Sequence, residues 1–311
     1  MKMNILIGFL AMVVFLSGDG ARALYSSFFL FKKINPFLVI FTASFISLLV
    51  TLIIAFVNKT NHTKAAESNS DKHRRLNLIL NYVMLNIFTV LNLVTGYLSI
   101  GYIIPAVSSA IAVSVGPMLH NLLRFNKTSS VEKWLSFLLF ILSAQLLLSD
   151  ASVIALRKGS ANIIIGFSLS LVCGIAVLCN TVICKRLSSA GEFPLRINTL
   201  RSILVLVVTF FLCIKNNLFS ISQLSFYHLI VFALFFVLVP QICLQLAIKN
   251  FDVGLTSLGI AAAPIFSAIV QVLFFDAYMG YNLGVLLCMN SLVIGSLSFI
   301  QIFSIKRVEQ Q

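Results

Sequence analysis

Residues 36–57 read PFLVIFTASFISLLVTLIIAFV, an apolar run that contains no charged residue. A helix needs about 20 consecutive, mostly apolar residues to cross the hydrocarbon core of a bilayer, so this run predicts a membrane-spanning helix. Similar runs occupy most of the remaining chain. The sequence therefore predicts ten spans: Asn4–Phe31, Pro36–Val57, Leu76–Tyr97, Ser99–Leu123, Val131–Leu148, Ala161–Cys184, Ile197–Ile214, Ser225–Leu246, Val253–Phe275 and Tyr278–Phe303.

The composition agrees with a multi-pass integral membrane protein. Hydrophobic residues make up 59% of the chain and charged residues 10%, with a mean hydropathy of +1.04. Soluble domains carry about 25% charged residues. The one clearly polar stretch is residues 58–75, NKTNHTKAAESNSDKHRR. It has no apolar periodicity and is predicted to be a disordered cytoplasmic loop.

The net charge of +13 is distributed unevenly between the two sides of the membrane. With the N-terminus in the cytoplasm, sixteen Lys and Arg residues fall inside and five outside, while Arg22 lies within the first span. This bias follows the positive-inside rule. The basic charge thus indicates orientation, with both termini cytoplasmic, and we expect no nucleic-acid partner. A signal peptide cleaved near residues 17–21 is the alternative for the N-terminus, but the apolar pattern continues beyond it.

The chain divides into two halves, residues 1–150 and 151–311, and each half supplies five predicted spans. Because five is odd, the second half must enter the membrane from the opposite side. Inverted repeats of this kind are typical of secondary transporters. Two pairs of positions support the division: Gly8 lies 28 residues before Pro36, and Gly166 lies 28 residues before Pro194.

Residues 251–295 resemble the closing helix pair of an EamA-type repeat. A helix of small residues carries Pro264, an acidic residue, Asp276, follows it, and the final helix is rich in glycine. Pro117 takes the corresponding place in the first half, and Arg201 resembles the arginine that opens the second helix of such repeats. The chain therefore resembles transporters of the drug/metabolite transporter superfamily. The resemblance implies an all-α membrane protein with ten transmembrane helices, arranged as two inverted five-helix repeats around a central cavity.

Ionisable side chains inside a span usually face a cavity or a charged partner, because inserting them costs about 2.5–3.5 kcal/mol. Asp19 and Arg22 lie three residues apart on one face of the first predicted helix, and Tyr25 continues that face. They either contact a substrate or coupling proton, or form a silent ion pair. Glycines on both sides of Asp19 are expected to loosen the helix. His120 either carries a coupling proton or is structural.

Amide and hydroxyl groups recur at helical spacing on other spans and complete the predicted substrate-binding set. These residues are Asn86, Asn92, Ser109, Asn180, Gln241, Gln245 and Thr256. Each of them is also suited to hydrogen-bonding a neighbouring helix, at about 0.6 kcal/mol. The spacing of the six cysteines matches no zinc site, and we predict neither a metal nor a cofactor.

Together with the resemblance, these residues lead us to expect a secondary transporter in a bacterial inner membrane. The expected substrate is a small polar metabolite, an amino acid or related zwitterion, moved by alternating access. Arg22 would bind its carboxylate, while Asp19 would hold Arg22, receive an ammonium group or bind a proton. The alternatives are an exporter of drug-like or nucleoside-like compounds, a membrane scaffold and an intramembrane enzyme. No compact catalytic motif supports an enzyme.

Overall fold

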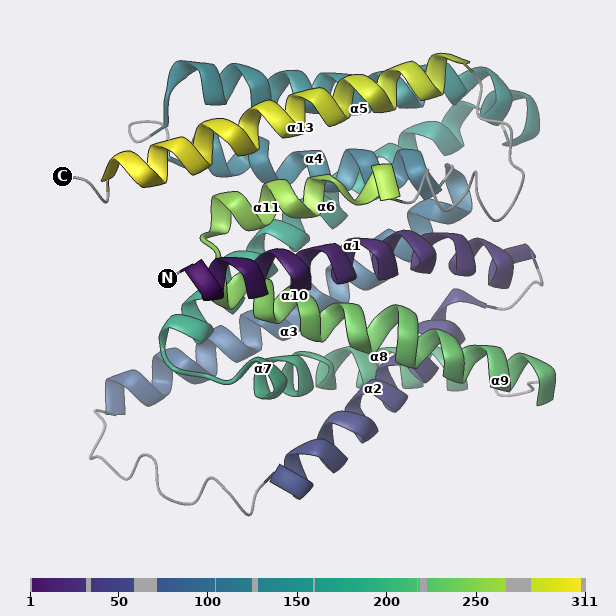
Figure 1. Cartoon of the computed structure of the whole chain (residues 1–311). Helices are drawn as coiled ribbons and strands as arrows, with labels where there is room; N and C mark the ends of the chain where they lie inside the picture. The colour runs from purple at the N-terminus through teal and green to yellow at the C-terminus, as the bar shows by residue number, and fades with distance from the viewer. Residues whose placement is uncertain are drawn as a thin grey trace.

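The computed structural model describes residues 2–31, 35–58, 72–103, 105–124, 128–158, 160–216, 218, 223–266 and 281–308, with only the backbone for some residues near helix ends. Every regular element within these ranges is helical (Figure 1). The elements are α1 Lys2–Phe31, α2 Pro36–Asn58, α3 Lys72–Tyr102, α4 Pro105–Leu123, α5 Ser130–Lys158, α6 Ser160–Ser189, α7 Pro194–Arg201, α8 Ile203–Lys215, α9 Gln223–Val231, a π-helix η2 Phe232–Leu238, α10 Val239–Asn250, α11 Val253–Ala261 and α13 Tyr281–Val308. Most of the predicted polar loop, residues 59–71, and Asp276 lie outside the described residues.

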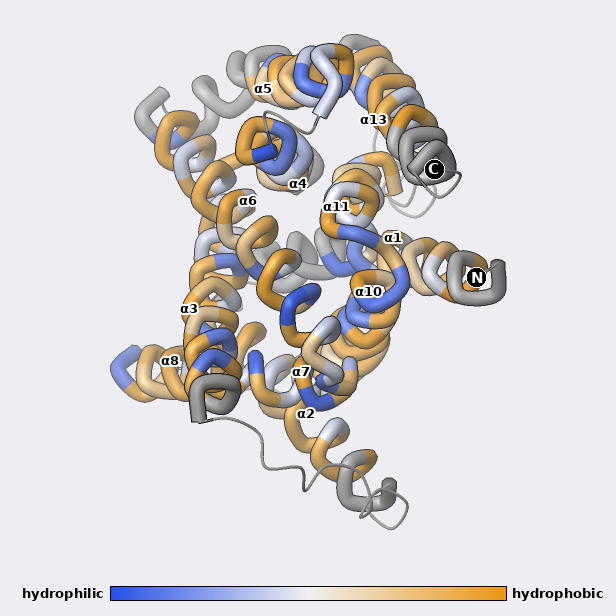
Figure 2. Tube along the Cα trace, turned by 90° about the vertical axis from the view of Figure 1, so that its left-hand side faces the viewer, coloured by the Kyte–Doolittle hydropathy of each residue, from blue (hydrophilic) through white to orange (hydrophobic). Residues whose placement is uncertain are grey.

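The helices have the length and composition of a multi-pass helical membrane protein. Six helical segments are long and apolar enough to cross a membrane, and three shorter ones are also apolar. Hydrophobic residues predominate along most of the labelled helices, with the short α7 as an exception (Figure 2). Large apolar side chains project outward, with Leu123 81% exposed and Trp134 and Leu292 each 72% exposed. Such a surface suits contact with lipid rather than water.

Several predicted boundaries were wrong, and proline explains the first of them. The third predicted span ended at Tyr97, whereas α3 continues to Tyr102 and α4 begins only at Pro105. Proline lacks a backbone N–H and is therefore favoured in the first turn of a helix. In addition, the fifth predicted span ended at Leu148, whereas α5 runs to Lys158.

The predicted seventh span, Ile197–Ile214, is interrupted in the structure. It consists of α7 and α8, which meet at Ser202. Within the predicted eighth span, the π-helix η2 ends just before Pro240. A proline ring clashes with the preceding helical turn, and a locally widened π-turn is a common way to relieve this. Both irregularities adjoin residues of the cavity described below.

The helices pack in pairs that join distant parts of the chain. α1 lies along α10, α3 along α6, α2 along α8, α4 along α11, and α5 along α13 (Figures 1 and 2). α4 also packs against α6, and glycine permits this close contact: a Cβ atom at Gly174 on α6 would overlap the backbone oxygen of Ala112 on α4. A Cβ atom at Gly18 would overlap the ring of Pro240. The expectation that glycine loosens α1 was wrong, because α1 is continuous through Gly18 and Gly20.

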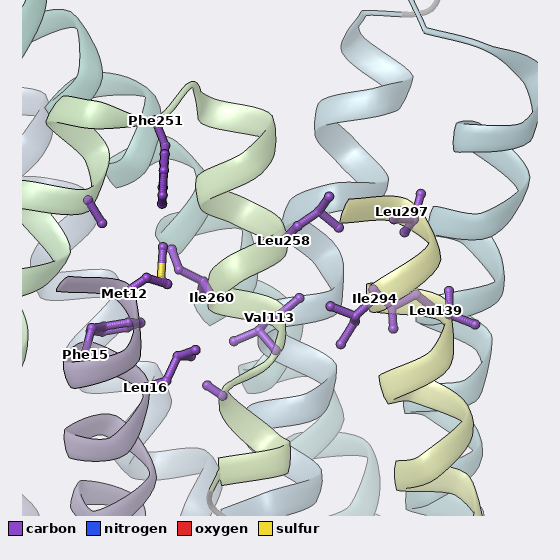
Figure 3. Close-up of a cluster of buried hydrophobic side chains, with 14 of the residues drawn as sticks. Met12, Phe15, Leu16, Val113, Leu139, Phe251, Leu258, Ile260, Ile294 and Leu297 are labelled. Atoms are coloured by element: carbon purple, nitrogen blue, oxygen red, sulfur yellow. The ribbon is translucent and has the colours of Figure 1, made fainter. Parts of the chain in front are cut away.

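A hydrophobic cluster drawn from α1, α4, α5, α10, α11 and α13 extends across the bundle to Phe251 at one end (Figure 3). Met12 and Phe15 of α1 face Phe251 and Ile260, and Leu258 continues the cluster toward α13. At the same end, the Lys185 ammonium of α6 donates hydrogen bonds to the carbonyl oxygens of Ile248 (2.9 Å), Lys249 (3.2 Å) and Phe251. The described ends of the chain, in α1 and α13, both lie at this end of the bundle (Figure 1).

The close contact between α4 and α6 yields a stability prediction. Gly174→Ala is expected to lower the free energy of unfolding by about 1–3 kcal/mol, because the added methyl group must push the two backbones apart. Gly295→Ala on α13 is the matched control, since no atom lies within 4 Å of the added Cβ. It should be neutral or stabilising by up to about 1 kcal/mol. Thermal unfolding in detergent compares the two variants, and equal stability would contradict the packing.

Candidate functional site

A cavity of about 140 Å³ lies in the middle of the bundle, between α1, α3, α4, α6, α7 and α10. Most of these helices face it with side chains at helical spacing, as α1 does with Phe15, Asp19 and Arg22, while α7 contributes Arg201 and α11 contributes Ile260. Three of the lining side chains are charged, namely Asp19, Arg22 and Arg201. The cavity thus combines charged and amide groups with apolar side chains such as Phe15 and Leu244.

Asp19 and Arg22 form an ion pair across one turn of α1. An Arg22 guanidinium nitrogen, Nη2, lies 2.5 Å from Oδ1 of Asp19. The Arg22 side chain is 31% exposed and that of Asp19 14%, although both lie deep in the bundle, because they face the cavity. The pair is therefore neutral as a unit but remains accessible to a small molecule that enters the cavity.

Arg201 adds a second guanidinium to the cavity. It is the last residue of α7, is only 9% exposed, and lies beside the sulfur of Cys184. Within the described part of the chain, no carboxylate lies within ion-pair distance of its guanidinium. The three charged groups of the cavity thus sum to +1. Burying a charge without a counter-ion is unfavourable unless water or a ligand solvates it.

Asn86 of α3 holds the helix break that presents Arg201. Its amide nitrogen donates to the carbonyl oxygen of Leu200 (2.9 Å), and its amide oxygen accepts from the backbone N–H of Leu204 (3.0 Å). In an unbroken α-helix these two backbone groups would bond to each other. The Asn86 amide is thus inserted into the helical ladder, which is one of the known causes of a kink.

Three other amides line the cavity and are partly fixed by their neighbours. The thiol of Cys173 donates to Oδ1 of Asn92 (3.3 Å), and the hydroxyl of Thr89 donates to Oδ1 of Asn180 (3.4 Å). Gln245 donates to the sulfur of Cys184 (3.2 Å).

Gln241 differs from these amides. It follows Pro240 directly, lines the cavity and has no hydrogen-bond partner among the residues that the structure describes. The Gln241 amide is therefore available to form hydrogen bonds with a ligand in the cavity.

The structure brings seven of the predicted substrate-binding residues together around the cavity: Asp19, Arg22, Asn92, Ser109, Asn180, Gln241 and Gln245. Asn86 does not line it and instead supports Arg201. Thr256 is fully buried, and its hydroxyl donates to the backbone oxygen of Asp252 (2.7 Å). His120 is buried near the end of α4 and does not line the cavity. The side chain of Tyr25 lies outside the described residues.

Sequence reasoning missed Arg201 as a cavity residue, together with Tyr97, Ser108 and Thr181. Arg201 was counted among the cytoplasmic basic residues that set the orientation. A signal was present, since Arg201 lies inside a predicted apolar span, as Arg22 does. The same insertion cost that singled out Arg22 applies to it.

Comparisons with known proteins support the fold but do not identify a family. The sequence matches no protein-family model and no curated protein. One solved crystal structure of a protein aligns with 99% of this chain and 98% of its own, with a TM-score of 0.66 and 14% sequence identity. At this identity the likeness concerns the fold alone. The whole chain, rather than one half of it, therefore has a counterpart of known fold.

The unbalanced charge of Arg201 predicts an unusual stability effect. Arg201→Gln should raise the melting temperature of the ligand-free protein by about 2–4 °C, because it removes a buried charge that lacks a counter-ion. Arg196→Gln, on the same helix, is the control. The Arg196 side chain is 62% exposed in its ion pair with Glu192, so its loss should change the melting temperature little. A clear loss of stability in Arg201→Gln alone would show that Arg201 is a structural residue.

Proposed function

We propose that the protein is a secondary transporter that moves a small polar metabolite across a bacterial inner membrane by alternating access. The observation that carries this proposal is the cavity: charged and amide side chains gather in the middle of a bundle whose outer surface is apolar. Ionisable groups at such a place typically mark a substrate or ion pathway. The resemblance to EamA-type transporters of the drug/metabolite transporter superfamily points to the same function.

The proposal includes ten membrane spans in two inverted five-helix repeats. Five of the helix pairs support it, because this set of pairs is unchanged when the halves are exchanged, whereas the extensive α4–α6 contact corresponds to a much smaller α1–α11 contact. α1 pairs with α10, and α3 pairs with α6. In the second half, α6 corresponds to α1 and α10 corresponds to α3, so exchanging the halves turns one pair into the other. The pairs α2 with α8, α4 with α11, and α5 with α13 join corresponding helices. This pattern is expected for repeats related by a two-fold axis.

Both repeats would contribute to one binding site. α1, α3 and α4 line the cavity from the first half, and α6, α7 and α10 line it from the second. Rocking of one repeat against the other would open the cavity to each side in turn. The end of the bundle at which Lys185 forms its hydrogen bonds also carries Arg186, Arg196 and Lys249. We therefore assign this end to the cytoplasmic side by the positive-inside rule.

Within this mechanism Arg22 binds the carboxylate of the metabolite, and Asp19 orients Arg22. A planar guanidinium can bind a carboxylate through two parallel hydrogen bonds. The amides of Asn92, Asn180 and Gln241 surround the remaining volume and are suited to polar groups on the substrate. An amino acid or a related carboxylate metabolite fits this chemistry.

The test begins with metabolite profiles of cells and medium from strains that lack or overproduce the protein. One class of carboxylate metabolite should shift between the two pools in opposite directions in the two strains. Its uptake is then measured in proteoliposomes. Arg22→Ala and Asp19→Asn are each expected to reduce uptake at least about tenfold, since each loses about 1.4 kcal/mol or more of substrate interaction. Arg196→Gln is the control and should transport normally. Normal transport by both cavity variants would contradict the site.

A further inference from the structure

A second, much smaller cavity lies next to the main one, on the side of α2. It has a volume of about 10 Å³ and is lined by Arg22 and Arg201, which also line the main cavity. Ser44 and Ser47 of α2 and Gln241 belong to its polar lining, together with Thr89, Tyr97 and Ser202. A volume of this size accommodates about one water molecule or one oxygen-bearing group. The two guanidinium groups thus lie at the junction of a small polar recess and a larger chamber.

Ser47 is the second observation that points to a ligand in this recess. Ser47 is 3% exposed, and its hydroxyl has no hydrogen-bond partner among the residues that the structure describes. Other buried hydroxyls of the same helix bond to their own backbone, as Thr42 does to Leu38 and Thr51 to Ser47. A buried hydroxyl without a partner is unfavourable, because it has lost its hydrogen bonds to water. It is therefore expected to bond to something that enters the recess.

We propose that Arg22, Arg201 and Ser47 form an oxyanion subsite that binds a carboxylate, and that the ligand carries a net charge of −1. This inference rests on the proposed transport function only for the statement that the ligand is the transported substrate. Arg201 supplies a guanidinium with no carboxylate partner among the described residues, and Ser47 supplies a hydroxyl donor. Both groups complement a carboxylate.

The charge balance of the cavity narrows the substrate class. Asp19 is already paired with Arg22 at 2.5 Å, so the ammonium group of a zwitterion would have to compete with that pair. A monoanion instead neutralises the excess charge of +1 without breaking an existing contact. The main cavity of about 140 Å³ has room for on the order of ten water molecules, and so for the body of a small organic acid. A small monocarboxylate therefore matches the site better than an amino acid does.

The experiment measures the melting temperature of the full chain in lipid nanodiscs with a defined set of solutes. The acids are sodium acetate and sodium lactate, and the neutral analogues are acetamide and lactamide. Alanine represents a zwitterion, sodium phosphate another oxyanion, and sodium chloride matches the ionic strength. Acetate and lactate are expected to raise the melting temperature by about 2–4 °C at saturation, and the neutral analogues should leave it unchanged.

The variants assign this shift to the subsite. Arg201→Gln should abolish the shift caused by lactate, and Ser47→Ala should reduce it. Arg201→Lys retains the charge but loses the planar fork, so it should keep a smaller shift, and this variant also serves if Arg201→Gln fails to fold. Arg196→Gln should respond like the wild type. A response to the amides equal to that of the acids, a response to phosphate alone, no response to either acid, or a full response in Arg201→Gln would each overturn the proposal.

The binding measurement separates the subsite from the transport function. If lactate stabilises the protein through Arg201 but reconstituted protein moves no solute, the subsite stands and the transporter assignment fails. If the protein transports neutral or zwitterionic solutes and Arg201→Gln has no effect on their uptake, transport stands and the oxyanion subsite is wrong.

Discussion

The structure depends on one constraint: two guanidinium groups and a single carboxylate are held in the middle of a bundle whose outer surface is apolar. Charges at such depth are unfavourable unless they are paired or solvated. Asp19 pairs with Arg22, but Arg201 has no acidic partner in the described part of the chain. The surrounding helices therefore have to leave a polar space, and a protein that keeps an unbalanced buried charge gives up stability for binding.

The local irregularities of the helices serve this constraint. Asn86 inserts its amide between the Leu200 carbonyl and the Leu204 N–H, so the break between α7 and α8 leaves no unsatisfied backbone group beside Arg201. The π-helix before Pro240 occurs where Gln241 enters the cavity. Gly18 allows α1 to contact Pro240 closely, one residue before Asp19. Irregular backbone and close packing thus position three of the cavity's polar side chains.

The helical architecture and the Asp19–Arg22 pair could be predicted from the sequence because both follow from local rules. Apolar runs of sufficient length predict helices, and ionisable residues within them predict a cavity or a partner. Arg201 could be recognised only by applying that second rule to a residue near the start of a predicted span. The role of Asn86 could not be predicted, because it depends on a contact between α3 and α7. The two contacting residues, Asn86 and Leu200, are more than a hundred residues apart in the sequence. The position of Thr256 away from the cavity was also not predictable, since a threonine hydroxyl in a helix can always bond to its own backbone.

The central claim is that the polar cavity is reached from both sides of the membrane in turn. The most direct measurement is the labelling of Ser109→Cys, which lines the cavity from α4, in a variant whose six native cysteines are replaced by serine. A membrane-impermeant maleimide is applied to intact cells and, separately, to inside-out membrane vesicles. Alternating access predicts labelling from both sides, because each of its two states exposes the cavity to one side. Labelling from one side only would contradict alternating access and would indicate a binding pocket rather than a transport pathway.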